Sequence, residues 1–68
     1  MNLSAKFLMK LIEQHGFIFK RSKGSHHIYY NAAVNKTIVV PLHGNKDLPK
    51  GTFLAILKQA GIDKNELK

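Results

Sequence analysis

Three β-prone runs lie between two amphipathic helical segments in this chain, and only short turns separate the runs. The first helical segment covers residues 4 to 15, with Ser4 placed to act as its N-cap. Its apolar residues recur at helical spacing: Leu3, Phe7, Leu8, Leu11 and Ile12. The segment ends at Gly16, which suits the left-handed conformation that follows a helix, and Phe17 can then pack back onto the helix.

The β-prone runs are FIFKR, HHIYY and KTIVVPL, and a loop leads from them to the second helical segment. Pro41 lacks a backbone N–H, which suits a strand terminus or an edge strand. Pro49 suits the first turn of the second helix. One face of that helix is apolar and holds Phe53, Ile56, Leu57 and Ala60. Gly61 and Ile62 repeat the stop of the first helix, and residues 63–68 form a polar tail.

This order of segments predicts an α+β fold of α-β-β-β-α type. The short connections favour antiparallel hairpins, so the three runs should form one antiparallel sheet. Both helices on one face of that sheet would bury their apolar stripes. The chain has 68 residues and no cysteine, which indicates a single domain over residues 1–68 with a small core and no disulfides. Gly51, early in the second helix, indicates the close approach of another backbone, either an RNA phosphate or the neighbouring strand, and packing against the strand is the favoured interpretation.

The charge balance favours a polyanionic partner. Eleven Lys and Arg residues against four Asp and Glu residues give a net charge of 11 − 4 = +7, and the sequence pI is near 10.0. Such a surface favours nucleic acid, the commonest polyanion of a cytoplasm. No apolar run approaches the roughly 18 residues of a membrane span. Charged residues interrupt the N-terminal segment, which is unlike a signal peptide. We therefore expect a cytoplasmic protein with no membrane partner.

Several classes of enzyme chemistry lack the residues they require. The four acidic residues are too few for a two-metal nuclease site, and two of them lie in the tail. Without cysteine, a zinc site would depend on four histidines that are scattered over a helix end, a strand and a loop. Ser25 directly precedes His26, and adjacent strand residues point to opposite faces, which argues against a Ser-His pair. No glycine-rich phosphate loop is present. We expect neither a metal nor a cofactor.

Acid–base chemistry by histidine on a basic surface remains. Imidazole exchanges protons near neutral pH, and RNA supplies its own nucleophile, the 2′-hydroxyl. One base beside cations that stabilise the phosphorane can therefore cleave RNA without metal. Candidate cations lie before the histidines and around the start of the second helix: Lys20, Arg21, Lys23, Lys46 and Lys50. Strand alternation separates His26 from His27, but it does not say which of them faces the helices.

The run RSKGSHHIYY, followed by VPLHGNKDLPKGTFLAILKQAGI, resembles the HicA toxins of bacterial toxin–antitoxin modules. The motifs G-S-H, V-P-x-H, K-D-L and G-T-x-x-x-I-L-K-Q-A-G occur in this order, and the resemblance extends from about residue 5 to residue 62. It implies a fold similar to double-stranded-RNA-binding domains, which agrees with the order derived above. It also implies a small ribonuclease that cleaves messenger RNA, arrests translation and is held inactive by a HicB-type antitoxin.

The resemblance also implies roles for individual residues. The catalytic histidine of the family directly follows a Gly-Ser pair, which is His26 here. The residues expected to bind RNA are then Lys20, Arg21, Lys23, Ser25, His27, His43, Lys46 and Lys50. The chain departs from the family pattern between its second and third strands, where NAAVN contains no glycine. This departure affects the shape of the hairpin tip and its contacts with RNA.

Two other functions fit the same sequence. A basic α-β-β-β-α domain can hold structured RNA without cleaving it, and it would show salt-sensitive affinity for RNA that stays intact. A domain that binds only a protein partner would show no substantial affinity for RNA at physiological salt. Cleavage of RNA that depends on His26 distinguishes the ribonuclease from both.

Overall fold

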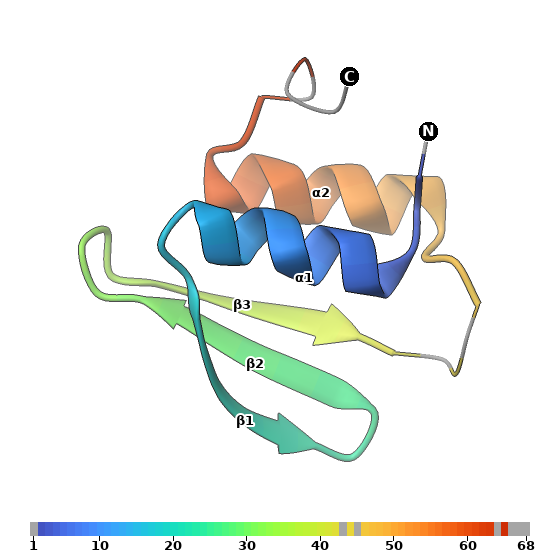
Figure 1. The fold of residues 1–68 in the computed structure, drawn as a ribbon, viewed down its shortest axis with the longest axis horizontal. Coiled ribbons are helices and arrows are strands. Elements are labelled where there is room, and N and C mark those ends of the chain that lie inside the picture. The colour runs from blue at the N-terminus through green and yellow to red at the C-terminus, as the bar shows by residue number, and fades with distance from the viewer. Residues whose placement is uncertain (1, 43, 45, 64, 66–68) are drawn as a thin grey trace.

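The computed structural model of the chain describes residues 2–42, 44, 46–63 and 65. It contains a helix, three strands and a second helix in that order (Figure 1): α1 (Ala5–Gln14), β1 (Ile18–Lys23), β2 (His26–Asn31), β3 (Lys36–Pro41) and α2 (Lys50–Ala60). The predicted α+β fold, similar to double-stranded-RNA-binding domains, is confirmed. Neither helix of the described chain is long and apolar enough to cross a membrane.

A serine cap starts α1, and a glycine in the left-handed conformation follows each helix. The Ser4 side chain caps α1, since its Oγ accepts a hydrogen bond from the Phe7 N–H at 3.1 Å. Gly16 follows α1 with a φ of 93°, and the Phe17 N–H donates to the Ile12 carbonyl at 3.0 Å. The end of α2 repeats this geometry with a glycine at a φ of 75° followed by a buried isoleucine. Both helices therefore stop by the predicted mechanism.

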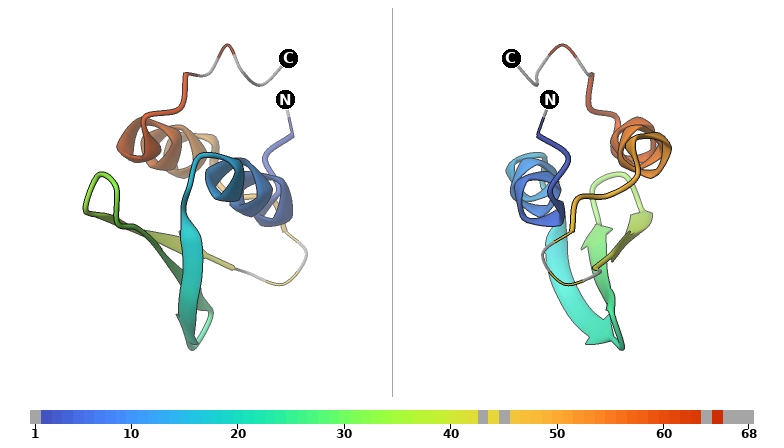
Figure 2. Two further views of the ribbon diagram at one scale, coloured as in Figure 1. Left: turned by 60° about the vertical axis from the view of Figure 1, so that its left-hand side comes forward. Right: turned by 90° about the vertical axis from the view of Figure 1, so that its right-hand side faces the viewer.

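The three strands form one antiparallel sheet in the order β1-β2-β3. His26 to Asn31 of β2 pair with Pro41 to Lys36 of β3 without interruption. The register of β1 against β2 shifts between Phe19 and Arg21, which places a bulge at Lys20. Both helices lie on one face of the sheet and the other face is open (Figure 2). The molecule thus has two layers.

The core lies between the helices and the two strands β2 and β3. Its largest fully buried side chains are Phe53, Leu8, Ile12, Ile38, Leu57 and Val40. All six residues of β1 are exposed, and the chain contributes Phe17 to the core just before this strand begins. The hairpin of β1 and β2 extends away from the helices (Figure 2). β1 is therefore held by its backbone pairing with β2 and by the contacts of the Phe19 ring with His27 and Tyr29.

The far end of β2 is tied to the end of α1 by the buried Asn31. Its Nδ2 donates to the His15 carbonyl at 3.1 Å, and its Oδ1 accepts from the Ala33 N–H at 3.0 Å. The turn NAAVN closes without glycine because Asn35 adopts the left-handed conformation, with a φ of 51°. An asparagine thus takes the role that a glycine usually has in such a turn.

The interpretation of Gly51 as a close packing contact is wrong. A Cβ atom placed on Gly51 would meet no neighbouring atom within 4 Å. The residue is exposed near the start of α2.

Candidate active site

His26 is the first residue of β2 and directly follows the tight turn from β1. Gly24 makes this turn possible with a φ of 60°. The Ser25 carbonyl accepts a hydrogen bond from the Leu42 N–H at 2.7 Å, which joins the turn to the end of β3. His26 is therefore held at a fixed corner of the sheet although its side chain is exposed.

The two adjacent histidines lie on opposite faces of the sheet. His26 belongs to the open face, where its neighbours across the strands are Lys23 and Pro41. His27 lies on the face that carries the helices, since its partner on β3 is the fully buried Val40. The sequence pattern did not say which histidine faces the helices. In the structure His27 does, and His26, which follows Gly-Ser, lies exposed on the open face.

The His27 ring is half-buried beneath the hairpin. Its centroid lies 5.2 Å from that of Phe19, with 47° between the ring planes. The Nδ1 atom is buried and has no hydrogen-bond partner. These contacts are those of a packing residue, and a contact between His27 and RNA stays a prediction.

The cations before the histidines lie beside His26. Lys23 is its direct partner across the hairpin, and Arg21 occupies the next row of the same open face, opposite Ile28. Facing side chains on neighbouring antiparallel strands have Cβ atoms about 5 Å apart. Lys20 lies at the bulge, and all three cations are exposed. The open face thus combines one imidazole with a row of positive charge.

The predicted cations around the start of the second helix, Lys46 and Lys50, do not lie in this row. Lys46 lines a separate hollow with Lys6 and Leu42, next to the start of α1. Lys50 is the first residue of α2 and is exposed. The N-terminus of α2 has no side-chain cap, because Pro49 occupies the capping position. His43 lies outside the described residues.

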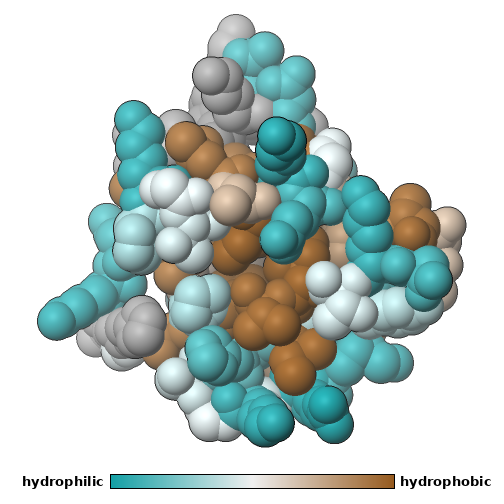
Figure 3. All heavy atoms as spheres, turned by 180° about the vertical axis from the view of Figure 1, so that it is seen from behind, coloured by the Kyte–Doolittle hydropathy of each residue, from teal (hydrophilic) through white to brown (hydrophobic). Residues whose placement is uncertain are grey.

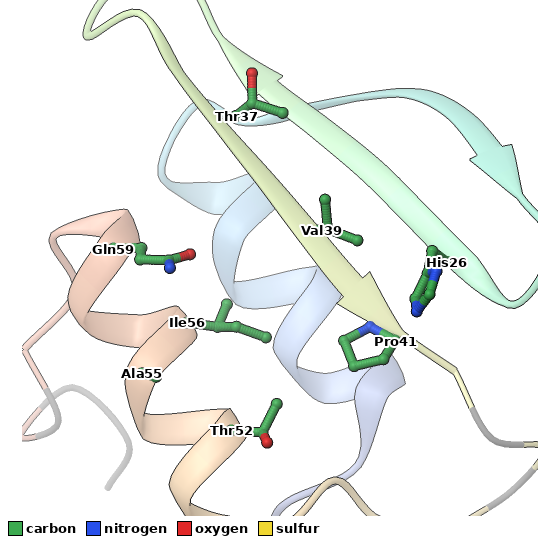
Figure 4. Close-up of a pocket in the computed structure, with 8 residues that line it drawn as sticks. All are labelled: His26, Thr37, Val39, Pro41, Thr52, Ala55, Ile56 and Gln59. Carbon is green, nitrogen blue, oxygen red and sulfur yellow. The ribbon is translucent and has the colours of Figure 1, made fainter.

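A groove of about 500 Å³ begins at His26 and runs between β3 and α2. Figure 4 shows His26 at one end of it and Gln59 at the other. The groove is lined by His26, Thr37, Val39, Pro41, Thr52, Ala55, Ile56 and Gln59. This groove was not predicted from the sequence. The signals for it were the alternation of Thr37, Val39 and Pro41 in β3 and the uncharged positions 52, 55 and 59 of α2.

A carboxylate contact joins the two layers of the molecule. The Tyr29 hydroxyl donates to Glu13 Oε2 at 3.1 Å and so links β2 to α1. Burial of the phenol, together with the hydrogen bond to Glu13 and its charge, raises the pKa of Tyr29 to about 12.

Within the described part of the chain, no three His, Asp or Glu side chains come together as a metal site would require. The chemistry available beside His26 is thus that of imidazole and cations.

Comparison with known proteins identifies one family. The sequence model of the family "HicA toxin of bacterial toxin-antitoxin" matches residues 5–62, which extend from the start of α1 to the buried Ile62 just after α2. The matched region includes His26, its turn and the cations of β1. A search of curated proteins gave no match.

Proposed function

Because the chain belongs to the HicA family of toxins from bacterial toxin–antitoxin modules, we propose that it is a metal-independent endoribonuclease that cleaves messenger RNA and arrests translation. The toxin acts in the cytoplasm, where messenger RNA is translated, and a HicB-type antitoxin holds it inactive. The observation that carries the catalytic part of the proposal is the exposed imidazole of His26 with Lys23 as its direct partner across the hairpin.

In the proposed reaction, His26 acts as the general base. Its neutral imidazole takes the proton from a 2′-hydroxyl, and the 2′-oxygen attacks the adjacent phosphorus. The bond from phosphorus to the 5′-oxygen breaks, and that oxygen takes a proton from water. The products are a 2′,3′-cyclic phosphate and a 5′-hydroxyl. Because the nucleophile belongs to the substrate, this route needs no metal-bound water.

Lys23 and Arg21 supply the electrostatic part of the mechanism. The negative charge on the phosphorane oxygens grows in the transition state, so cations placed beside the base lower the barrier. The same cations attract the RNA backbone, together with Lys20 and the further basic residues of a chain with a net charge of +7. Ser25, His27, His43, Lys46 and Lys50 are proposed as further RNA contacts.

The test is cleavage of RNA by purified protein in the presence of EDTA. Wild type should cut the RNA, and His26→Ala should lower the rate by about 100-fold or more, the range that general base catalysis supplies. His15→Gln is the matched control, because this exposed histidine lies at the end of α1 rather than on the open face. It should retain the wild-type rate. A substrate with a single 2′-deoxyribose at the cleaved position should stay intact.

Three results would contradict the proposal. Cleavage that needs added divalent metal would exclude the metal-independent route. Cleavage of the 2′-deoxy substrate would exclude the 2′-hydroxyl as nucleophile. A folded His26→Ala variant with the wild-type rate would exclude His26 as the base. RNA that is bound but stays intact would instead support the non-catalytic RNA-binding module.

A further inference from the structure

The outer edge of β3 pairs with no strand of the described residues. β3 is the last strand in the order β1-β2-β3. Just beyond this strand, the Leu42 N–H donates toward the β2 side, to the Ser25 carbonyl. Backbone groups of alternate residues point the same way in an antiparallel strand. Thr37 and Val39 therefore present their N–H and C=O groups outward, and Pro41 presents a carbonyl.

Natural sheets usually protect such an edge with charged side chains, proline, bulges or a covering segment. β3 carries such residues only at its two ends, Lys36 and Pro41. Val39 in the middle is apolar and 45% exposed. Among the described residues, no strand pairs with this edge. The middle of β3 is therefore free to accept another strand.

The side of α2 that lines the groove beside this edge is uncharged, although the chain as a whole has a net charge of +7. The α2 residues that line the groove are Thr52, Ala55, Ile56 and Gln59. Ala55 and Gln59 are exposed, Thr52 is half-buried and Ile56 belongs to the core, so this wall carries no charged side chain. Figure 3 shows apolar side chains gathered in the middle of this side of the molecule, with hydrophilic ones around them. Uncharged, mostly short side chains leave room for a peptide backbone to lie beneath the helix.

We propose that an extended segment of the cognate antitoxin adds to the outer edge of β3 as a fourth strand and fills the groove beneath α2. A toxin of a toxin–antitoxin module has an antitoxin as its partner, and an exposed sheet edge beside a groove that can take alternate side chains is a standard site for the addition of a strand. About five residues, roughly 16 Å of extended chain, would cover β3 from Thr37 to Pro41.

The charges around the groove define the chemistry of that segment. At one end, the Lys36 Nζ donates to the Gln59 carbonyl at 3.2 Å and closes the groove. At the other end lie His26 and its partner Lys23. No carboxylate is among the residues that line the groove. The segment therefore has apolar side chains facing Val39 and Ile56 and acidic side chains at both ends. A second copy of this basic chain would not supply them.

The inhibitory consequence of this binding rests on the proposed function. A strand that fills the groove as far as Pro41 ends against the His26 ring, so its last acidic side chain occupies the place of the scissile phosphate. The binding itself rests only on the family and on the geometry of β3. It is therefore tested without any measurement of cleavage.

The decisive variant is Val39→Pro, which removes an N–H that points away from β2 and so leaves the β2–β3 ladder intact. Val39→Thr is the matched control, because it keeps both the N–H and the branched shape. The probe is the cognate HicB-type antitoxin, purified and titrated into each variant by calorimetry. Val39→Pro should bind at least tenfold more weakly than wild type, and Val39→Thr should bind within about threefold.

A second measurement uses only the wild-type chain, in case the proline variant does not fold. In the complex with the antitoxin, the Thr37 and Val39 amides should gain protection from hydrogen exchange. Unchanged exchange at both amides would overturn the proposal, as would wild-type antitoxin affinity in a folded Val39→Pro. If Val39→Pro lowers only the affinity for RNA, or only self-association, the edge of β3 serves another occupant and the proposal is also overturned. If the wild-type chain does not cleave RNA, the proposed function is contradicted, but the binding of the antitoxin at β3 is not.

Discussion

The same substitution at two glycines should have opposite effects on stability. Gly16 has a φ of 93°, and a Cβ atom there would lie 3.1 Å from the Asn31 Nδ2. An L-residue in a left-handed conformation costs roughly 1–2 kcal/mol. Crowding would also displace the Asn31 amide from the His15 carbonyl, a hydrogen bond worth about 1 kcal/mol. Gly16→Ala should therefore destabilise the chain by about 2–3 kcal/mol.

Gly51→Ala is the control for this effect. A Cβ atom at Gly51 meets nothing within 4 Å, and alanine is favoured over glycine in a helix by up to about 1 kcal/mol. This substitution should raise the melting temperature by a few degrees, whereas Gly16→Ala should lower it by about 10 °C or more. Thermal and urea denaturation followed by circular dichroism measure both.

A double-mutant cycle with Asn31→Ala separates the two parts of the cost at Gly16. Without the Asn31 amide the crowding disappears, so Gly16→Ala should cost only the backbone term of roughly 1–2 kcal/mol in that background. A cost that is the same in both backgrounds would refute the contact with Asn31. A cost below about 0.5 kcal/mol in the wild-type background would refute the reasoning from the left-handed backbone as well.

Three further outcomes are expected. The folded state raises the pKa of Tyr29 from 10.0 to about 12, so it favours the protonated phenol. The resulting stabilisation is complete below pH 10 and is lost as the pH rises toward 12. In a plot of the urea midpoint against pH, Tyr29→Phe should remove this fall in stability. Phe53 is fully buried, and Phe53→Ala should cost about 3–5 kcal/mol, enough to leave much of this small domain unfolded by circular dichroism. If Lys23 and Arg21 contact phosphates, replacing either with glutamine should weaken RNA binding and lower the slope of log affinity against log salt by about one, whereas an unchanged slope would place that cation outside the RNA contacts.

The elements of the fold were predictable because local signals coincide with them. The stops at Gly16 and Gly61 mark both helix ends, and Ser4 marks the first helix start. The full exposure of β1 was not predictable, since FIF resembles a core strand as much as a surface one. Only the placement of the helices over β2 and β3 decides that Phe17 is buried and that Ile18 and Phe19 are exposed.

The candidate site was predictable only in part. Alternation separated His26 from His27, but both faces of HHIYY carry apolar or aromatic residues, so the pattern did not orient the strand. The family resemblance assigned the catalytic role to His26, and the exposed position of its ring is compatible with that role. The groove depends on how far α2 lies beyond the edge of β3, a tertiary relation that no local pattern encodes. The opposite case is Gly51, where helix propensity alone indicated a contact that is absent.

The exposure of all six β1 residues indicates that this strand opens separately from the rest of the fold. Opening of β1 breaks its ladder with β2 and the contacts of the Phe19 ring with His27 and Tyr29, but it removes no buried β1 side chain from the core, so it should occur more often than global unfolding. Lys23 and Arg21 belong to this strand, while His26 stays with the more stable β2. The face that we propose for RNA would then be complete only in part of the free population, and a ligand that holds β1 in register would raise that fraction. Amide exchange of β1, faster than that of β3 and slowed selectively by RNA, would be the signature of such a face.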